Sequence, residues 1–102
     1  MAVAQYLDLR GVLWCHVANE RRTSIQSGVR LKKKGVKSGV PDVLIFNPNC
    51  HYSGLAIELK IKPNKVSANQ KVWLESLKPM RWRTEVCYSL DEVIELVEFY
   101  LI

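Results

Sequence analysis

The chain has 102 residues, 48% of them hydrophobic and 25% charged, which fits one globular domain over residues 1–102. A domain of this size can bury roughly 60–70% of its unfolded surface, so it needs no disulfide staples. No apolar run approaches the ~20 residues that cross a bilayer, and no secretory leader is recognisable, so we expect a cytoplasmic protein. The net charge is +5.

The first third of the chain predicts a helix, a strand and a second, basic helix. The first helix spans Ala2–Arg10 and ends at Gly11, since glycine commonly follows the last helical turn. A strand is expected over Val12–Val17. A loop then leads into a basic helix within Arg21–Gly35, with Ser24 as its N-cap.

The middle of the chain predicts two strands joined by a turn. Val43–Phe46 is wholly apolar, as expected of a strand whose two faces are both covered. Residues 47–54 are rich in Asn, Ser and Gly, which favours a turn. In the next strand, Leu55–Lys60, alternation places Glu58 and Lys60 together on one face.

Two spacings predict helix starts in the last third of the chain. Ser67 with Gln70, and Ser89 with Glu92, each fit a capping box. A strand is expected between these helices, over Trp82–Tyr88. The whole order predicts an α/β domain in which a small mixed sheet is flanked by helices on both faces.

Positive charge is concentrated between Arg21 and Lys37, where seven cations occur without an acid. Such a band favours a polyanionic partner, and a solvated helix face is the alternative. If the partner is DNA, these side chains would contact phosphates rather than bases. The candidate DNA-binding residues are Arg22, Arg30, Lys32, Lys33, Lys34 and Lys37.

The three cysteines, Cys15, Cys50 and Cys87, are scattered and odd in number, which argues against a disulfide framework. Cys50 adjoins His51, but the paired spacing of structural zinc ligands is missing. We expect reduced thiols.

Two acids and a lysine predict a site for phosphodiester chemistry. If the two middle strands form a hairpin with an index sum near 100, Asp42 lies across from Glu58, with Cβ atoms about 4.5–5.5 Å apart. Two carboxylates that close need a cation between them, and Mg²⁺ prefers oxygen ligands. Lys60 would stand beside that metal. The alternative is a surface-facing strand pair, with Asp42 a simple turn residue after Pro41.

These residues resemble a known family. Gly35–Asp42, followed by Ile57–Lys60, is similar to the PD-(D/E)xK nuclease superfamily, and most similar to its VRR-NUC branch, the virus-type replication-repair nucleases. The likeness extends over nearly the whole chain. It includes Asn19-Glu20, the glycines and basic residues from Gly28, the Ser67–Gln70 helix start, and the closing strand, turn and helix over Tyr88–Ile102.

The resemblance implies a restriction-endonuclease-like core and roles for individual residues. Asp42 and Glu58, with the backbone carbonyl of Leu59, would hold Mg²⁺ or Mn²⁺, and Lys60 would be the catalytic lysine. Gln70 would lie near the site, and a simple capping role is the alternative. The family's first-helix glutamate has no counterpart: Gln5 and Asp8 are the nearest residues, so that ligand is upstream of Met1, dispensable, or replaced imperfectly by Asp8.

The function implied is structure-selective cleavage of branched DNA, such as four-way (Holliday) junctions, by a phage or prophage DNA-repair homodimer in a bacterial host. A DNA-binding module that has lost strong catalysis is the alternative. The last helix adds modest support for a dimer, because it has a wide apolar arc and Phe99 falls on its acidic side. A monomer whose own core absorbs that arc remains the other possibility.

Overall fold

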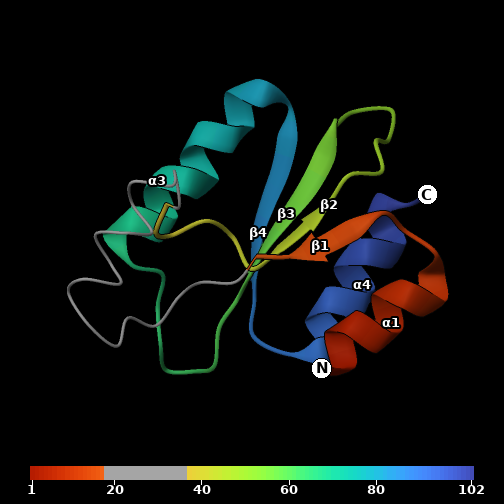
Figure 1. Ribbon diagram of the computed structural model, residues 1–102, viewed down its shortest axis with the longest axis horizontal. Coiled ribbons are helices and arrows are strands. Elements are labelled where there is room, and N and C mark those ends of the chain that lie inside the picture. The colour runs from red at the N-terminus through yellow and green to blue at the C-terminus, as the bar shows by residue number, and fades with distance from the viewer. Residues whose placement is uncertain (18–36) are drawn as a thin grey trace.

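The computed structural model describes residues 1–17 and 37–102 (Figure 1). The predicted basic helix, its N-cap Ser24 and the Asn19-Glu20 pair lie outside the described residues. Elsewhere the predicted order of helices and strands is confirmed. The elements are α1 (Ala2–Arg10), β1 (Trp14–His16), β2 (Val43–Ile45), β3 (Gly54–Leu59), α3 (Ala68–Leu77), a 3₁₀ turn η1 (Lys78–Met80), β4 (Trp82–Cys87) and α4 (Leu90–Tyr100).

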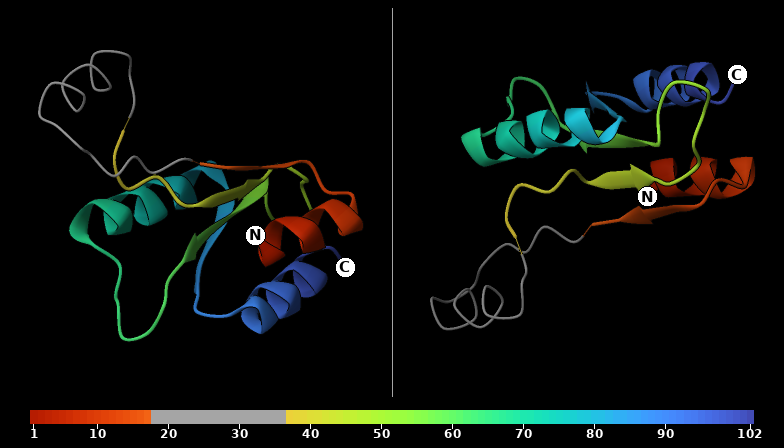
Figure 2. Two further views of the ribbon diagram at one scale, coloured as in Figure 1. Left: turned by 60° about the horizontal axis from the view of Figure 1, so that its bottom comes forward. Right: turned by 90° about the horizontal axis from the view of Figure 1, so that it is seen from above.

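The strands form one mixed sheet in the order β1-β2-β3-β4. The β1–β2 and β2–β3 pairs are antiparallel, and the β3–β4 pair is parallel. Helix α3 covers one face, while α1 and α4 cover the other (Figure 2). The predicted α/β class, with a small mixed sheet between helices, is therefore confirmed. No helix among the described residues is long and apolar enough to cross a membrane.

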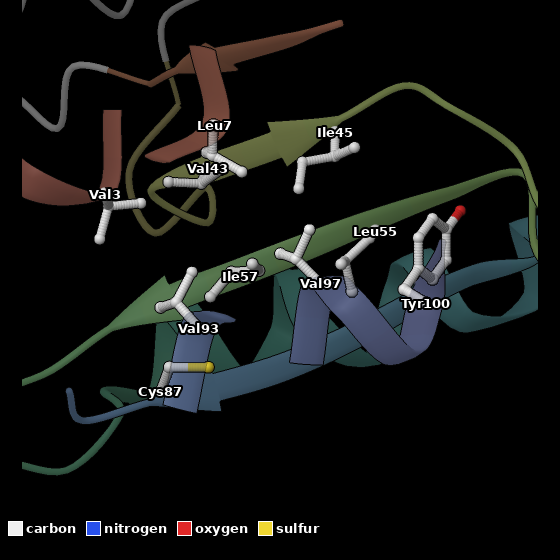
Figure 3. Packing of buried hydrophobic residues seen from close by; sticks show 10 residues of the cluster. All are labelled: Val3, Leu7, Val43, Ile45, Leu55, Ile57, Cys87, Val93, Val97 and Tyr100. Atoms are coloured by element: carbon white, nitrogen blue, oxygen red, sulfur yellow. The ribbon is translucent and has the colours of Figure 1, made fainter. Parts of the chain in front are cut away.

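The hydrophobic core lies between the sheet and the α1–α4 layer (Figure 3). It is built by alternation, because every second residue of β2 and β3 points to this face. The fully buried side chains on those strands are Val43, Ile45, Leu55 and Ile57. They meet α1 and α4 residues that recur at helical spacing, namely Val3, Leu7, Val93, Val97 and Tyr100.

The predicted apolar arc of α4 is therefore used mainly inside the chain. Val93, Val97 and Tyr100 are buried, and Leu96 and Leu101 pack partly against the same core. Phe99 is 67% exposed, as expected from its position beside the acidic residues. The arc as a whole is not a free surface, because α1 and the sheet already cover most of it.

The local signals at helix ends are largely confirmed. Gly11 adopts a left-handed conformation, φ 71°, after the last turn of α1. Ser67 and Gln70 form the complete capping box of α3. The second box is only half formed: Ser89 Oγ accepts the Glu92 N–H, but the Glu92 carboxylate accepts the N–H of Tyr88 instead of that of Ser89.

Strands β1, β2 and β4 are shorter than predicted, while β3 has the predicted length and begins one residue earlier. The run Val12–Val17 gives only Trp14–His16, although backbone hydrogen bonds continue beyond both ends of the strand. The Val17 N–H donates to the Asp42 carbonyl, and the Phe46 N–H donates to the Leu13 carbonyl, each at 2.8 Å. The first of these bonds ties the segment that carries Asp42 to the edge of the sheet.

Candidate active site

The register of the β2–β3 hairpin brings the two predicted acids together. Val43 pairs with Ile57, which gives an index sum of 100, and one further step places Asp42 across from Glu58. Asp42 is held there by a backbone bond, since its Oδ2 accepts the Leu59 N–H at 2.8 Å. The predicted register is confirmed.

Glu58 is an acid inside the protein, 2% exposed, on the face of β3 that α3 covers. Its Oε2 accepts a hydrogen bond from the Gln70 amide at 3.1 Å and lies 3.8 Å from the Lys60 amine. Its Oε1 is buried and accepts no hydrogen bond from any described residue. Burial is the main cause that raises the pKa of Glu58 to about 8; the neighbouring Asp42 carboxylate adds to the shift and Lys60 opposes it.

Gln70 makes both the capping contact and the contact with the site that the sequence offers as alternatives. Its side-chain oxygen accepts the Ser67 N–H at 2.8 Å, which closes the capping box of α3. Its side-chain amide simultaneously donates to Glu58. The start of α3 therefore fixes the orientation of the buried carboxylate.

The loop before Asp42 is clamped against the first turn of α3. Gly39 has φ 87°, and a Cβ at this position would lie 2.7 Å from the backbone carbonyl carbon of Asn69. The Asn69 side chain donates to Ser38 Oγ at 3.0 Å. Nothing local in the sequence predicts that the backbone of Asn69 comes this close to Gly39.

The donor set fits a divalent metal ion. Two opposed carboxylates, one with an unpartnered buried oxygen and a raised pKa, are the arrangement that a hard cation stabilises. Within residues 1–17 and 37–102 no group of three His, Cys, Asp or Glu side chains could hold a metal. The described residues therefore offer two carboxylates and require backbone or water oxygens to complete the coordination.

The carboxylate of Asp8 is engaged within the fold. Its Oδ1 accepts the indole N–H of Trp14 at 2.9 Å, which links α1 to β1. Gln5 is exposed on the same helix. Among the described residues Asp8 also forms no three-residue ligand group with Asp42 and Glu58, so its substitution for the first-helix ligand has no support.

Of the candidate DNA-binding residues, only Lys37 lies in the described part of the chain, where it is exposed on the segment that leads to Asp42. Arg22, Arg30, Lys32, Lys33 and Lys34 lie outside the described residues. Another exposed cation follows the site: the Lys62 amine lies 5.7 Å from the centroid of the Tyr88 ring, just beyond the end of β3.

Comparison with known proteins decides the family. The sequence profile of the VRR-NUC domain matches residues 2–91. The chain belongs to the VRR-NUC family. A solved structure described as a VRR_NUC domain protein is similar to this VRR-NUC domain, with a TM-score of 0.74 and 27% sequence identity. The match covers 86% of this chain and 66% of that one, so the chain spans slightly less than two thirds of its neighbour's length. No curated protein matches it.

Family membership gives this VRR-NUC domain a nuclease-type fold. The candidate site lies at one end of β3, between the sheet and the start of α3. Asp42 comes from the loop before β2, Glu58 from the end of β3, Lys60 from the residue just after that strand, and Gln70 from the start of α3.

Proposed function

We propose that this VRR-NUC domain is a metal-dependent endonuclease that hydrolyses phosphodiester bonds in DNA. The observation that carries the proposal is the Glu58 carboxylate, buried beside Asp42 and Lys60 with one oxygen unpartnered. Asp42, Glu58 and the Leu59 carbonyl would hold Mg²⁺ or Mn²⁺. A bound ion of this kind lowers the pKa of a coordinated water and neutralises charge on a phosphate.

The chain's own residues prepare the site for that reaction. The Leu59 N–H donates to the Asp42 carboxylate, and the Gln70 amide donates to the Glu58 carboxylate. These hydrogen bonds orient both proposed ligands before substrate binds. The Lys60 side chain is 17% exposed, and its amine lies 3.8 Å from the Glu58 Oε2 atom. From that position it can hold the attacking water and stabilise the negative charge that develops on the phosphate.

For the substrate we favour branched DNA, including four-way junctions, cut by a homodimer. The described residues of one chain form one such site, while a junction needs two matched cuts. A two-fold dimer offers two identical sites to a substrate of similar symmetry. The basic residues between Arg22 and Lys37 would bind its phosphates. A phage or prophage origin in a bacterial cytoplasm and a role in DNA repair fit this substrate.

A second candidate is a DNA-binding module that has weak or lost catalysis. The observation in its favour is the lack of a third acidic ligand among the described residues, where Asp8 is engaged by Trp14. The intact set of Asp42, Glu58 and Lys60 favours the enzyme.

Cleavage assays separate the two. Linear, flapped and four-way-junction DNA are incubated with the wild-type protein, with and without Mg²⁺ or Mn²⁺, beside Asp42→Asn and Glu58→Gln. We expect metal-dependent cleavage, strongest on the junction, that both variants abolish while their thermal unfolding stays cooperative. Binding without cleavage in either metal would favour the module, and cleavage in excess EDTA would falsify the metal site.

A further inference from the structure

Among residues 1–17 and 37–102, no strand pairs with the outer edge of β4. This strand stands at the end of the sheet order, beyond β3. The Lys60 N–H donates to the Cys87 carbonyl at 2.9 Å, so the backbone groups of Cys87 point toward β3. Because successive residues of a strand direct these groups to opposite sides, those of Arg83 and Glu85 also point inward. The N–H and carbonyl groups of Trp82, Thr84 and Val86 therefore point outward.

The surface is hollowed on both sides of this edge. Toward α4, a hollow of about 440 Å³ is lined by residues that include Arg83, Glu85 and the exposed ring of Phe99. Toward η1, a second hollow of about 520 Å³ is lined in part by Lys78, Trp82 and Thr84. An incoming strand therefore meets both unpaired backbone groups and room for side chains, as in β-strand addition.

We propose that the occupant of this edge is β4 of a second copy of the same chain, paired antiparallel about a two-fold axis at Thr84. In that register Arg83 lies opposite Glu85 of the partner, and Glu85 lies opposite the partner's Arg83. Trp82 lies opposite Val86 in the same way, an aromatic and a β-branched side chain. Thr84 meets its own counterpart, and its outward N–H and carbonyl groups form both central hydrogen bonds.

The charges select this register over its neighbours. A two-fold axis at residue 83 would set Arg83 against its own copy, and an axis at residue 85 would set Glu85 against its own copy. Like charges directly opposite one another are unfavourable. Within one chain Arg83 Nε and the Glu85 carboxylate are 3.1 Å apart and partly exposed. The pairing at Thr84 would extend this ion pair into an alternating cluster of four charges.

The same self-complementarity favours a second copy over an unrelated peptide. The segment Trp82–Val86 repeats its own chemistry when it is reversed: large apolar, charged, threonine, opposite charge, apolar. An axis perpendicular to the sheet keeps like faces on the same side, so both α3 faces would look the same way. With flat-sheet spacings the two Glu58 residues would be roughly 20 Å apart. This inference names the surface of the proposed homodimer and does not depend on catalysis.

Charge reversal tests the pairing. Arg83→Glu places two glutamates opposite each other across the axis, and Glu85→Arg places two arginines there. We expect the wild-type protein to be a dimer by light scattering at micromolar concentration, and each single variant to be a monomer. An equimolar mixture of the two variants should return to the mass of a dimer, because every facing pair then has opposite charges. The doubly substituted Arg83→Glu/Glu85→Arg protein should also be a dimer.

The mixture is the decisive arm, because it cannot restore the ion pair within either chain. Lys71→Glu, an exposed charge reversal on α3 outside both hollows, is the matched control and should remain a dimer. A monomeric wild type, single variants that stay dimeric, or a mixture that stays monomeric would each overturn the proposal. Cleavage of linear DNA is measured in parallel. A monomeric variant that still cuts linear DNA shows that the dimer interface can be lost while the nuclease site remains active.

Discussion

The side chain of Gln70 joins the capping box of α3 to the Glu58 carboxylate, with a hydrogen bond of 3.1 Å from its amide to Oε2. Helix start and candidate active site are therefore one structural unit. A capping residue usually contributes to stability alone. Here it also has the geometry of a residue that orients a metal ligand.

Substitution of Gln70 separates these two contributions when it is compared with Ser67→Ala. Both changes damage the capping box, and we expect each to lower stability by about 1 kcal/mol. Only Gln70→Ala removes the bond to Glu58, so it alone should reduce cleavage or metal affinity by about 10–100-fold. Cleavage rates and thermal unfolding of both variants check this. Equal loss of activity in Ser67→Ala would assign the effect to the helix rather than to the carboxylate.

Lys60→Ala should slow cleavage while leaving metal affinity nearly unchanged. The amine approaches the Glu58 oxygen to 3.8 Å, and in the proposed mechanism it acts on the water and the phosphate. Loss of one such group costs about 100- to 1,000-fold in rate. Lys62→Ala removes the same charge two residues along, beside the Tyr88 ring, and should retain most of the rate. Calorimetric titration with Mn²⁺ measures binding. A Lys60→Ala protein that no longer binds Mn²⁺ would contradict this division of roles.

The raised pKa of Glu58 predicts that the metal-free protein loses stability as the pH rises. In the unfolded chain this carboxyl titrates near 4.5, and in the fold its pKa is about 8. The folded state therefore binds the extra proton between these values, and its stabilising effect is complete below 4.5 and lost as the pH passes through about 8. Urea unfolding across this window, in EDTA, should show a decline that Glu58→Gln removes.

Mg²⁺ should act against this decline. The ion needs the ionised carboxylate, so its stabilising effect on the wild-type protein should grow with pH and be accompanied by proton release. Glu58→Gln should respond little. Equal stabilisation of both proteins by Mg²⁺ would place the ion elsewhere.

Gly39→Ala should disturb the site through the backbone. The added Cβ would press on the Asn69 backbone, and φ 87° is unfavourable for alanine, so we expect destabilisation of at least about 1 kcal/mol with weaker metal binding. Gly11→Ala is the matched control: its φ is also positive, at 71°, but nothing lies within 4 Å of the added atom. It should lower stability without changing the metal affinity of the folded protein. Metal titrations of both variants at a temperature where both are folded make the comparison.

The hairpin that carries the acids was predictable because one alternating pattern of apolar residues determines both which side chains are buried and which residues pair across the strands. Alternation in Leu55–Lys60 assigns one face to the core, and that assignment leaves Glu58 on the other. Helix starts were predictable for a similar reason, since Ser67 and Gln70 interact over three residues. At Ser89 the local pattern was right about the serine and wrong about the backbone group that Glu92 accepts from.

Contacts between distant segments were beyond such patterns. No periodicity relates Gly39 to Asn69, or shows that β4 ends the sheet beside β3. The apolar arc of α4 was recognised, but the sequence could not tell that α1 and the sheet bury it within one chain. The surface that we propose for a second copy is the outer edge of β4 instead.

The hairpin pairing limits how the gene for this domain can change in length. Val43 and Ile57 face the core, while Asp42 and Glu58 face α3, so inserting or deleting one codon between Asp42 and Ile45, or between Leu55 and Glu58, exchanges the two faces. Either a carboxylate enters the core or the acids separate. The turn over residues 47–53 lies outside the paired segments, where side chains need not alternate between two faces. It can therefore gain or lose codons without moving either acid. Among related genes we therefore expect length differences in this turn and none within the paired segments.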